Sequence, residues 1–337
     1  MKAWILKDQV REVESKPLKL VNMPDPHPRG SEIRIKVDAC GICRTDIHIA
    51  EGDLPLKKSP IVLGHEIVGV VDELGLKAKR FKIGERVGVT WLHSICGTCK
   101  YCLSGRENYC PDFKCTGWDR DGGFAEYTLI GEEFALPLPG INSKPEDTAP
   151  LLCPGVAGYC AYKLTRVRRG DKLGLYGFGP TAYYTLRVAI YHGIDVFVNT
   201  RSLHHRKEAK KYGALWVGNA MEKDVPTALD AVIVFPPAGA LVEKALSQIK
   251  RGGILVLAPV SMSHIEIGDY SNNLWGRDIR TLYNINRADA EEFLNIAGEI
   301  KLSTCNEVFP FEKLQEALIL VKNGRLSKPN AVVRVNQ

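Results

Sequence analysis

The chain has 337 residues and a formal net charge of +6, with 45% hydrophobic and 25% charged residues. This composition is that of an ordinary globular protein, and the length favours two domains over one. No apolar stretch approaches the ~20 residues of a membrane-spanning helix, and the first residues lack the apolar run of a secretory signal, so we expect a cytoplasmic protein that binds no membrane. The dispersed basic residues argue against nucleic acid as a partner, although local clusters occur at 166–169 and 204–211.

The first part of the chain reads as β-structure. We predict strands at residues 2–6, 33–37, 61–71 and 82–89. The third is expected as one continuous strand with a glycine before His65. Prolines between the first two strands exclude a helix there. Many short strands separated by glycine and proline are typical of a small irregular barrel.

The stretch from Cys40 to His48 contains thiols, an imidazole and a carboxylate within a few residues. Thiolate and imidazole are both zinc ligands, and a carboxylate can orient a ligating histidine. Taken alone, Cys40 and Cys43 are equal candidates for ligands and His48 looks like another. We expect a short helix to begin after Arg44.

Ten cysteines in a cytoplasmic chain are more typical of metal ligands or core thiols than of disulfides. Four of them form a compact lobe within residues 92–115: Cys96, Cys99, Cys102 and Cys110. This spacing predicts an all-cysteine tetrahedral zinc site, the alternative being chance core cysteines. With four protein ligands the metal has no position left for substrate, so the predicted role is structural.

From residue 150 onward, short apolar strands alternate with helices. The predicted strands are 172–176, 195–200, 215–218, 231–235, 254–258 and 279–283, and the helices are 182–192, 203–212 and 241–250. This alternation indicates a parallel sheet with crossovers, and six strands with a glycine turn after the first predict a doubly wound Rossmann domain. The tail is expected to form helices at 289–300 and 311–323 and a strand at 331–335.

The turn after the first of these strands reads Gly177-Phe178-Gly179-Pro180-Thr181-Ala182. It fits the G-x-G-x-x-G/A fingerprint of dinucleotide binding because it follows a strand and opens a helix. The glycines allow a tight turn and a close approach to the pyrophosphate, which faces the helix N-terminus. The alternative is a plain strand–helix turn.

The second strand of this domain ends in Asn199-Thr200-Arg201-Ser202 without an acidic residue. An acid there would bind a ribose 2′-hydroxyl and repel a 2′-phosphate. Arg201, with hydroxyls on either side, can accept the phosphate by charge-assisted bonds, so we favour NADP(H) over NAD(H). Alternatively, Arg201 stacks on adenine or points to solvent.

Three further residues are ambiguous when taken separately. Gly64-His65-Glu66 places an imidazole and a carboxylate directly after a glycine, and Cys153 lies where the first domain gives way to the second. A lone His-Glu pair is usually structural, and a lone buried cysteine is usually inert core.

Together, these motifs resemble the zinc-dependent medium-chain alcohol dehydrogenases over essentially the whole chain, and most of all their prokaryotic branch related to cinnamyl alcohol dehydrogenases. The resemblance rests on the motifs at 41–48, 64–66, 96–110, 152–153 and 177–182, in the family's order. It implies an α/β protein with a GroES-like catalytic domain (1–153 and 288–337), which carries the zinc lobe, and a Rossmann domain (154–287).

The resemblance also assigns roles to residues. Cys43, His65 and Cys153 would bind a catalytic zinc, with Glu66 as a fourth or transient ligand and Cys40 a bystander. The implied machinery beyond the metal comprises Thr45 and His48 in a proton relay, Asp46 on the second nitrogen of His65, Arg44 on the cofactor pyrophosphate, and Gly69, Gly75 and Gly84 in turns.

The chain also departs from the family's pattern. Ala157 stands where a threonine near the nicotinamide is common, and Asn330 stands where many members place a pyrophosphate-binding arginine, which leaves Arg325 as a loose substitute. Leu54 and Trp91 are expected to line an apolar substrate pocket, with Trp118 and Trp275 as weaker candidates, although a large aromatic is more often core than pocket.

The leading hypothesis is therefore reversible hydride transfer between a primary alcohol or aldehyde and NADP(H), with two zinc ions per chain. Alternatives are an NAD-dependent enzyme, a secondary-alcohol or polyol dehydrogenase on the same scaffold, and a non-catalytic NADPH-binding protein. We expect a homodimer or homotetramer whose subunits meet at residues 254–260 and 279–283.

Overall fold

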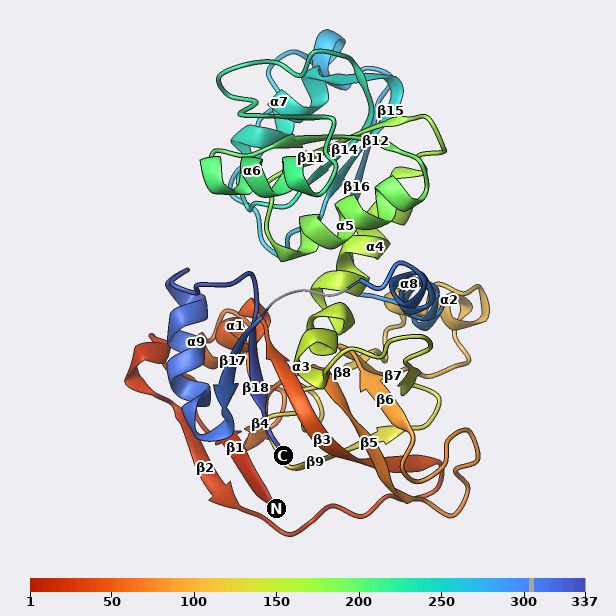
Figure 1. Ribbon diagram of the computed structural model, residues 1–337, viewed down its shortest axis with the longest axis vertical. Helices are drawn as coiled ribbons and strands as arrows, with labels where there is room; N and C mark the ends of the chain where they lie inside the picture. The colour runs from red at the N-terminus through yellow and green to blue at the C-terminus, as the bar shows by residue number, and fades with distance from the viewer. Residues whose placement is uncertain (303–305, 337) are drawn as a thin grey trace. The chain divides into compact units, whose positions relative to one another are not determined.

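The computed structural model describes residues 1–302 and 306–336. The chain forms two compact units, which are shown in Figure 1. Unit 1 comprises Met1–Cys153 and Asn284–Gln337, and unit 2 comprises Pro154–Tyr283. Among the described residues, no helix has both the length and the apolar character needed to cross a bilayer.

Unit 1 is mainly β-structure. Its strands are β1 (Lys2–Leu6), β2 (Leu18–Asn22), β3 (Glu32–Ile42), β4 (Ile61–Val62), β5 (Glu66–Leu74), β6 (Arg86–Val89), β7 (Leu92–Ser94), β8 (Lys114–Cys115), β9 (Tyr127–Gly131), β10 (Leu136–Pro137), β17 (Glu307–Pro310) and β18 (Ala331–Arg334). The largest sheet has the order β10-β6-β5-β3-β18-β17, and β9 also pairs with β3. A second sheet has the order β2-β1-β4, and β7 pairs with β8.

Strand β3 lies at the centre of unit 1. Ile33, Ile35 and Val37 are fully buried while the residues between them are partly exposed, which is the alternation of a strand with one face on the core. From Ala39 to Ile42 every residue is buried. The strand therefore delivers Cys43, the next residue, into the protein interior.

The predicted strand 61–71 is wrong as a single element. Strand β4 pairs with β1, whereas β5 pairs with β3 and β6. Gly64 lies between them with φ of +92°, a left-handed conformation that cannot continue a β-ladder. The chain changes sheets at this glycine, and His65 follows directly.

The helices of unit 1 are α1 (Arg44–Glu51), α2 (Lys100–Leu103), α3 (Pro145–Thr148), α8 (Arg287–Glu299) and α9 (Leu314–Lys322), with short 3₁₀ turns η1 (Val13–Ser15), η2 (Glu107–Tyr109), η3 (Ala149–Leu152) and η5 (Phe311–Lys313). The short helix expected after Arg44 and the two helices expected in the tail are confirmed, with ends shifted by one to three residues.

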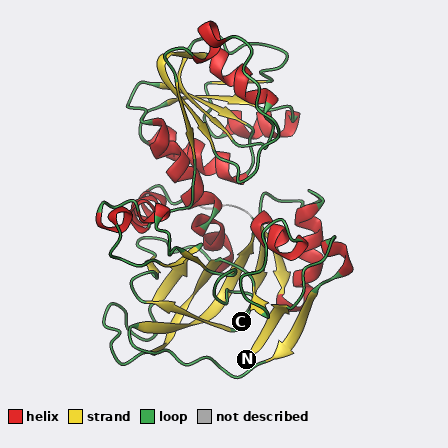
Figure 2. Ribbon diagram, turned by 180° about the vertical axis from the view of Figure 1, so that it is seen from behind, coloured by secondary structure: helices red, strands yellow, loops and turns green. Residues whose placement is uncertain are grey.

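Unit 2 is a parallel α/β structure with helices on either side of its sheet (Figure 2). Its strands are β11 (Lys172–Tyr176), β12 (Asp195–Asn199), β13 (Trp216–Gly218), β14 (Leu229–Val234), β15 (Ile249–Leu257) and β16 (Asp278–Thr281). Its helices are α4 (Pro154–Thr165), α5 (Pro180–Tyr191), α6 (Leu203–Lys211) and α7 (Ala240–Ser247), with one π-turn, η4 (Tyr270–Leu274). The order β13-β12-β11-β14-β15-β16 is the doubly wound order of dinucleotide-binding domains, so the predicted fold is confirmed.

One segment of unit 2 differs from its prediction. The helix predicted at 241–250 ends at Ser247, and β15 begins at Ile249. Leu229 of β14 lies opposite Ile249, but Ala231 lies opposite Ile254, so residues 250–253 loop out of the ladder. Gly252, with φ of +81°, allows this excursion.

Substitution of Gly64 tests whether this bend is required. We expect Gly64→Ala to lower the free energy of unfolding by about 3 kcal/mol, because a Cβ would add overpacking to backbone strain. The added atom would lie 2.8 Å from Phe124 Cδ1 and 2.9 Å from Cys40 Sγ. Gly84→Ala is the matched control, since its φ is +87° and no atom lies within 4 Å of the added Cβ, and it should cost only about 1 kcal/mol. Equal losses in urea unfolding of the two variants would show that crowding at Gly64 is unimportant.

Candidate active site

Unit 1 brings together four side chains that can hold a metal ion. Cys43, His65, Glu66 and Cys153 each offer one ligand atom, and these atoms all lie within 4.8 Å of one another. Cys43 stands before α1, His65 directly precedes β5, Glu66 is the first residue of β5, and Cys153 follows η3. Three segments distant in sequence therefore converge on one point.

The Asp46 carboxylate joins two of these segments. It is fully buried, and its two oxygens accept the backbone N–H of Cys43 (2.8 Å) and of Gly64 (3.1 Å). Its Oδ1 also lies 3.5 Å from His65 Nδ1, which is an ionic contact rather than a good hydrogen bond. Asp46 thus faces Nδ1 of His65, but among the described residues that nitrogen has no hydrogen-bond partner, so the predicted role of Asp46 stays a prediction.

The two thiols are spaced for one tetrahedral ion. Cys43 Sγ and Cys153 Sγ are 3.8 Å apart. Two sulfurs on a regular zinc tetrahedron, with bonds of about 2.3 Å, would be about 3.8 Å apart. Hydrogen bonding from the Cys153 thiol holds the pKa of Cys43 well below its usual value, so one of the two sulfurs is readily a thiolate.

Glu66 completes the cluster from a position that depends on a neighbouring glycine. A side chain at Gly41, its partner on β3, would collide with the Glu66 carboxylate. Burial, together with the charge of Cys43, raises the pKa of Glu66 well above its usual value. For His65, burial acts to lower the pKa, but the charges of Asp46 and Cys43 outweigh it and raise the pKa. This donor set of two sulfurs, an imidazole and a carboxylate fits zinc.

The four cysteines of the lobe also lie together. Their ligand atoms are within 4.8 Å of one another, and neighbouring sulfurs are 3.5 to 3.9 Å apart. The backbone N–H groups of Thr98 and Cys99 lower the pKa of Cys96 to about 6, which favours the thiolate that zinc requires. The geometry thus fits the structural zinc site that the spacing predicted.

Thr45 and His48 lie one turn apart on α1. Thr45 Oγ1 is 3.5 Å from Cys43 Sγ, so its hydroxyl reaches the metal cluster. His48 Nδ1 is 2.7 Å from Asp53 Oδ2. The sequence analysis missed Asp53. Gly52, which ends α1 with φ of +92°, turns the chain back toward the helix, and a glycine followed by a carboxylate was the available signal.

Aromatic side chains continue outward from His65. The rings of His65 and Trp91 meet edge to face at 5.0 Å, and Trp91 stacks on Trp118 at 5.9 Å. Lys57 Nζ lies 3.6 Å from the centre of the Trp118 ring. Leu54 is half-buried in the loop after α1. Trp275 belongs to unit 2, where it is 57% exposed beneath the guanidinium of Arg251.

The predicted nucleotide turn of unit 2 has the geometry that the fingerprint requires. Gly177 has φ of +87°, and its N–H donates to Asn199 O at 2.7 Å. Gly179 precedes α5, and no atom lies within 4 Å of a Cβ placed there, so its backbone is open to a ligand. Pro180 occupies the first position of α5, where its missing N–H costs nothing. Phe178 and Ala182 are buried, whereas Thr181, in the first turn of α5, is partly exposed.

The loop after β12 is ordered by a residue that the sequence analysis did not single out. Arg206 Nε donates to Thr200 O at 2.8 Å, and Ser202 Oγ accepts the N–H of His205 at the start of α6. Arg201 is exposed. Asn199 is 4% exposed, and among the described residues neither polar atom of its side chain has a hydrogen-bond partner. A buried amide without a partner at this position fits a bound nucleotide.

The prediction that Gly69 lies in a turn is wrong, because Gly69 is inside β5 and pairs with Val37 and Val87. Gly75 follows β5, and Gly84 lies before β6 with φ of +87°.

The remaining predicted residues are also placed. Arg44 donates from Nη2 to Lys322 O at 3.3 Å, and Arg325 is exposed after α9. Asn330 is buried and donates to Asn306 Oδ1 at 2.8 Å. Ala157 lies in the first turn of α4.

Zinc, the metal that fits these donors, is not redox-active. A protein that uses zinc in an oxidation or a reduction therefore needs a separate electron carrier. The glycine turn of unit 2 provides a place for a dinucleotide. These two features define the class of zinc-dependent dehydrogenases.

Comparison with known proteins agrees with this class. A family model described as "Alcohol dehydrogenase GroES-like domain" matches residues 29–140. A protein of Mycobacterium tuberculosis (strain CDC 1551 / Oshkosh) named "Probable alcohol dehydrogenase AdhA" is 40% identical over 336 residues, which is 97% of this chain and 95% of that one. The chain belongs to the medium-chain zinc-dependent alcohol dehydrogenase family.

Solved structures resemble the whole chain. A cinnamyl alcohol dehydrogenase from Sorghum bicolor superposes with a TM-score of 0.86 at 27% identity, covering 99% of this chain and 97% of that one. A dehydrogenase from Sinorhizobium meliloti 1021 bound to NADP superposes with a TM-score of 0.86 at 25% identity, covering 99% and 98%. The predicted fold class and family are therefore both confirmed.

Metal analysis tests the two clusters separately. We expect about two zinc ions per chain in the wild type and about one in each of Cys43→Ala and Cys102→Ser, because each substitution removes one ligand of a different set. Only Cys102→Ser should also lower the thermal midpoint strongly, since that zinc stabilises the lobe. Cys115→Ala is the control, because this buried cysteine belongs to neither cluster. Loss of both ions in either variant would contradict independent sites.

Proposed function

We propose that the protein catalyses reversible hydride transfer between a primary alcohol, or the corresponding aldehyde, and NADP(H). The single observation that carries this proposal is the convergence of Cys43, His65 and Cys153, the first and last of which are 110 residues apart in sequence. Glu66 would act as a fourth or transient ligand. The lobe of four cysteines would hold a second, structural zinc.

The catalytic ligands would set the character of the metal. Zinc held there would lower the pKa of an alcohol and polarise its C–O bond, while the cofactor carries the electrons. Two thiolates and a neutral imidazole would leave the centre close to neutral, and the Asp46 carboxylate would keep the ring of His65 in one orientation.

Thr45 and His48 would move the proton. The hydroxyl of Thr45, which lies beside Cys43, would take the proton of the substrate alcohol, and His48 would pass it to solvent. Asp53 pairs with Nδ1 of His48, so it would fix the tautomer that leaves Nε2 able to accept. Asp53 is therefore a proposed positioning residue rather than a catalytic one.

Unit 2 would hold the cofactor. The turn from Gly177 to Thr181 would receive the pyrophosphate, and Arg44 would contribute a further positive charge. Thr200, Arg201 and Ser202 would receive the 2′-phosphate of NADP, because the loop has no acid and its arginine is exposed. The Sinorhizobium meliloti relative was solved with NADP, so the scaffold accommodates this cofactor.

The substrate would meet an apolar, aromatic wall. Trp91 stands against His65, and Leu54 lies in the loop that follows α1. Such surroundings favour unbranched or aromatic primary alcohols over sugars, since they offer few groups to pair with hydroxyls.

The thiolate clusters require a reducing compartment, so we assign the protein to the cytoplasm. We also propose a homo-oligomer that meets through β16, an edge strand whose Ile279 and neighbouring Tyr283 are 39% and 56% exposed.

Turnover by Cys43→Ala tests the proposed function. We expect this variant to lose activity by at least about a thousandfold while NADPH binds as in the wild type, because the substitution affects only the metal centre. Wild-type rates should be higher with benzyl alcohol and ethanol than with 2-butanol and sorbitol. Full activity of Cys43→Ala, or of the wild type after removal of zinc, would rule the mechanism out.

Arg201→Ala tests the choice of cofactor. We expect KM for NADP to rise about tenfold or more, from loss of a charge-assisted contact, and KM for NAD to change little. Arg206→Ala provides a contrast, because this residue orders the loop backbone and should raise both values. A wild-type preference for NAD would refute the proposal.

A further inference from the structure

The basic cluster at 166–169 has no role in the function proposed above. It follows α4 and precedes β11, so it lies at the amino ends of the parallel strands. The nucleotide turn follows the carboxyl end of β11, at the opposite edge of the same sheet. These arginines therefore need a different explanation from an anionic cofactor.

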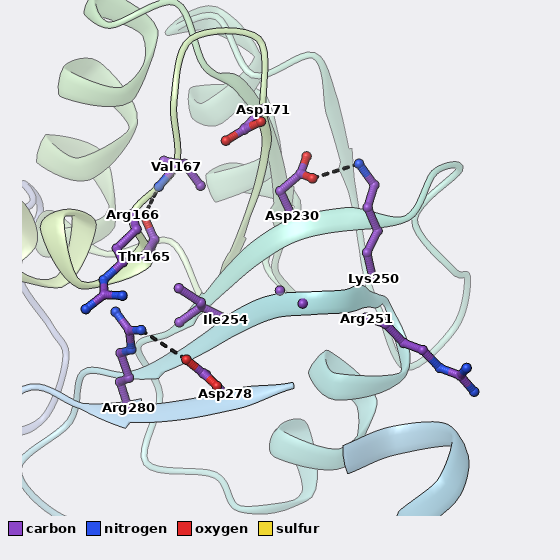
Figure 3. Close-up of a pocket in the computed structure, with 12 residues that line it drawn as sticks. Thr165, Arg166, Val167, Asp171, Asp230, Lys250, Arg251, Ile254, Asp278 and Arg280 are labelled. Atoms are coloured by element: carbon purple, nitrogen blue, oxygen red, sulfur yellow. Dashed lines mark hydrogen bonds and ion pairs between the residues drawn. The ribbon is translucent and has the colours of Figure 1, made fainter. Parts of the chain in front are cut away.

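A cavity of about 370 Å³ lies at this edge and is lined only by residues of unit 2 (Figure 3). Its walls come from the segment after α4 and from the starts of β14, β15 and β16. Part of the wall is the looped-out segment 250–253. A volume of this size is in the range of small-molecule sites.

Lys250 and Asp230 neutralise each other in the cavity, whereas the carboxylate of Asp171 accepts a backbone N–H, which carries no compensating charge. Asp230 accepts from Lys250 Nζ at 2.7 Å and from the backbone N–H of Lys172 at 2.9 Å. Asp171 accepts the backbone N–H of Arg168 at 2.7 Å. Arg251 projects away from the cavity in Figure 3, and its guanidinium lies over the Trp275 ring.

One end of the cavity keeps an excess of positive charge. Figure 3 shows the guanidinium groups of Arg166 and Arg280 pointing toward each other. Arg280 is fixed by bonds to Leu164 O (2.9 Å) and Asp278 Oδ2 (3.0 Å), which leaves most of its N–H groups available. Among the described residues, the guanidinium of Arg166 has no hydrogen bond or ion pair. Of these two guanidinium groups, only that of Arg280 is paired with a carboxylate.

The backbone of Arg166 adds to the argument. Its φ is +57°, in the left-handed region that costs an arginine free energy and a glycine none. A glycine would end α4 more cheaply at this position.

We infer that the end of this cavity walled by Arg166 and Arg280 binds a phosphate group, either as inorganic phosphate or as the phosphomonoester of a small metabolite. Two guanidinium groups offer paired donors to phosphate oxygens. The cavity is much larger than one phosphate ion, so an organic part would have room. Its hydroxyls would meet the carboxylates of Asp171 and Asp230.

Calorimetric titration of the zinc-loaded full chain with inorganic phosphate, at constant ionic strength, tests this site. We expect saturable binding that Arg166→Gln weakens about tenfold. Arg168→Gln removes the same charge two residues away and should change the affinity less than about twofold. Arg201→Ala, which acts in the loop after β12, should change it equally little.

Arg166→Gly is a second variant that controls for misfolding. It removes the cation, and a glycine adopts the left-handed backbone conformation of this position without strain. It should weaken phosphate binding as Arg166→Gln does while the thermal midpoint stays equal to or above that of the wild type. A parallel titration with ribose 5-phosphate separates the two sources. Affinity at least about tenfold above that of inorganic phosphate identifies a phosphomonoester, and equal affinity identifies phosphate itself.

Absence of saturable binding would overturn the inference. So would binding that Arg166→Gln and Arg168→Gln affect equally, or that only Arg201→Ala weakens, because the anion would then sit elsewhere. None of these results depends on alcohol turnover, so the inference and the proposed function fail independently.

Discussion

The cluster of candidate metal ligands around Cys43 depends on one buried carboxylate. Asp46 is inaccessible to solvent, and such a charge is tolerated only with close partners. Its partners are the backbone N–H groups of Cys43 and Gly64 and the ring of His65. One side chain on α1 therefore fixes both the start of its own helix and the bend that carries the histidine. Cys43 and His65 keep their positions because the backbone of Cys43 and that of Gly64, the residue before His65, are tied to the same carboxylate.

The two units divide the work according to what their architectures offer. The antiparallel sheets of unit 1 bring distant segments side by side, which suits a metal centre made of ligands from three places in the chain. The parallel sheet of unit 2 places every strand-to-helix turn at one edge, which suits an extended dinucleotide. At the opposite edge of that sheet, where the strands begin, Arg166 and Arg280 line a cavity.

The sequence predicted those parts that follow from fixed spacing. The four-cysteine lobe and the glycine turn at Gly177 occupy short motifs and could be named in advance, and strand–helix alternation predicted unit 2. The motif at 40–48 left Cys40 and Cys43 as equal candidates, and only the family resemblance favoured Cys43. The misses depend on backbone conformation. An apolar run does not show that Gly64 adopts positive φ, and nothing in the pattern shows that residues 250–253 leave the ladder. The pairing of Asp53 with His48 and the buried amide of Asn199 appear only when the chain is folded.

The place of β18 in unit 1 has a consequence for synthesis. Cys40, Gly41 and Ile42 on β3 pair with Val333, Val332 and Ala331, which are synthesised after the whole of unit 2. Unit 2 is a single continuous segment and has all its strands long before that moment. During translation the strand that leads to Cys43 therefore keeps an unpaired edge, and this edge is exposed to other chains until the C-terminal strand arrives. Unit 2 can therefore fold before unit 1, although unit 1 begins earlier in the sequence. The large sheet of unit 1 is completed only when β18 pairs with β3.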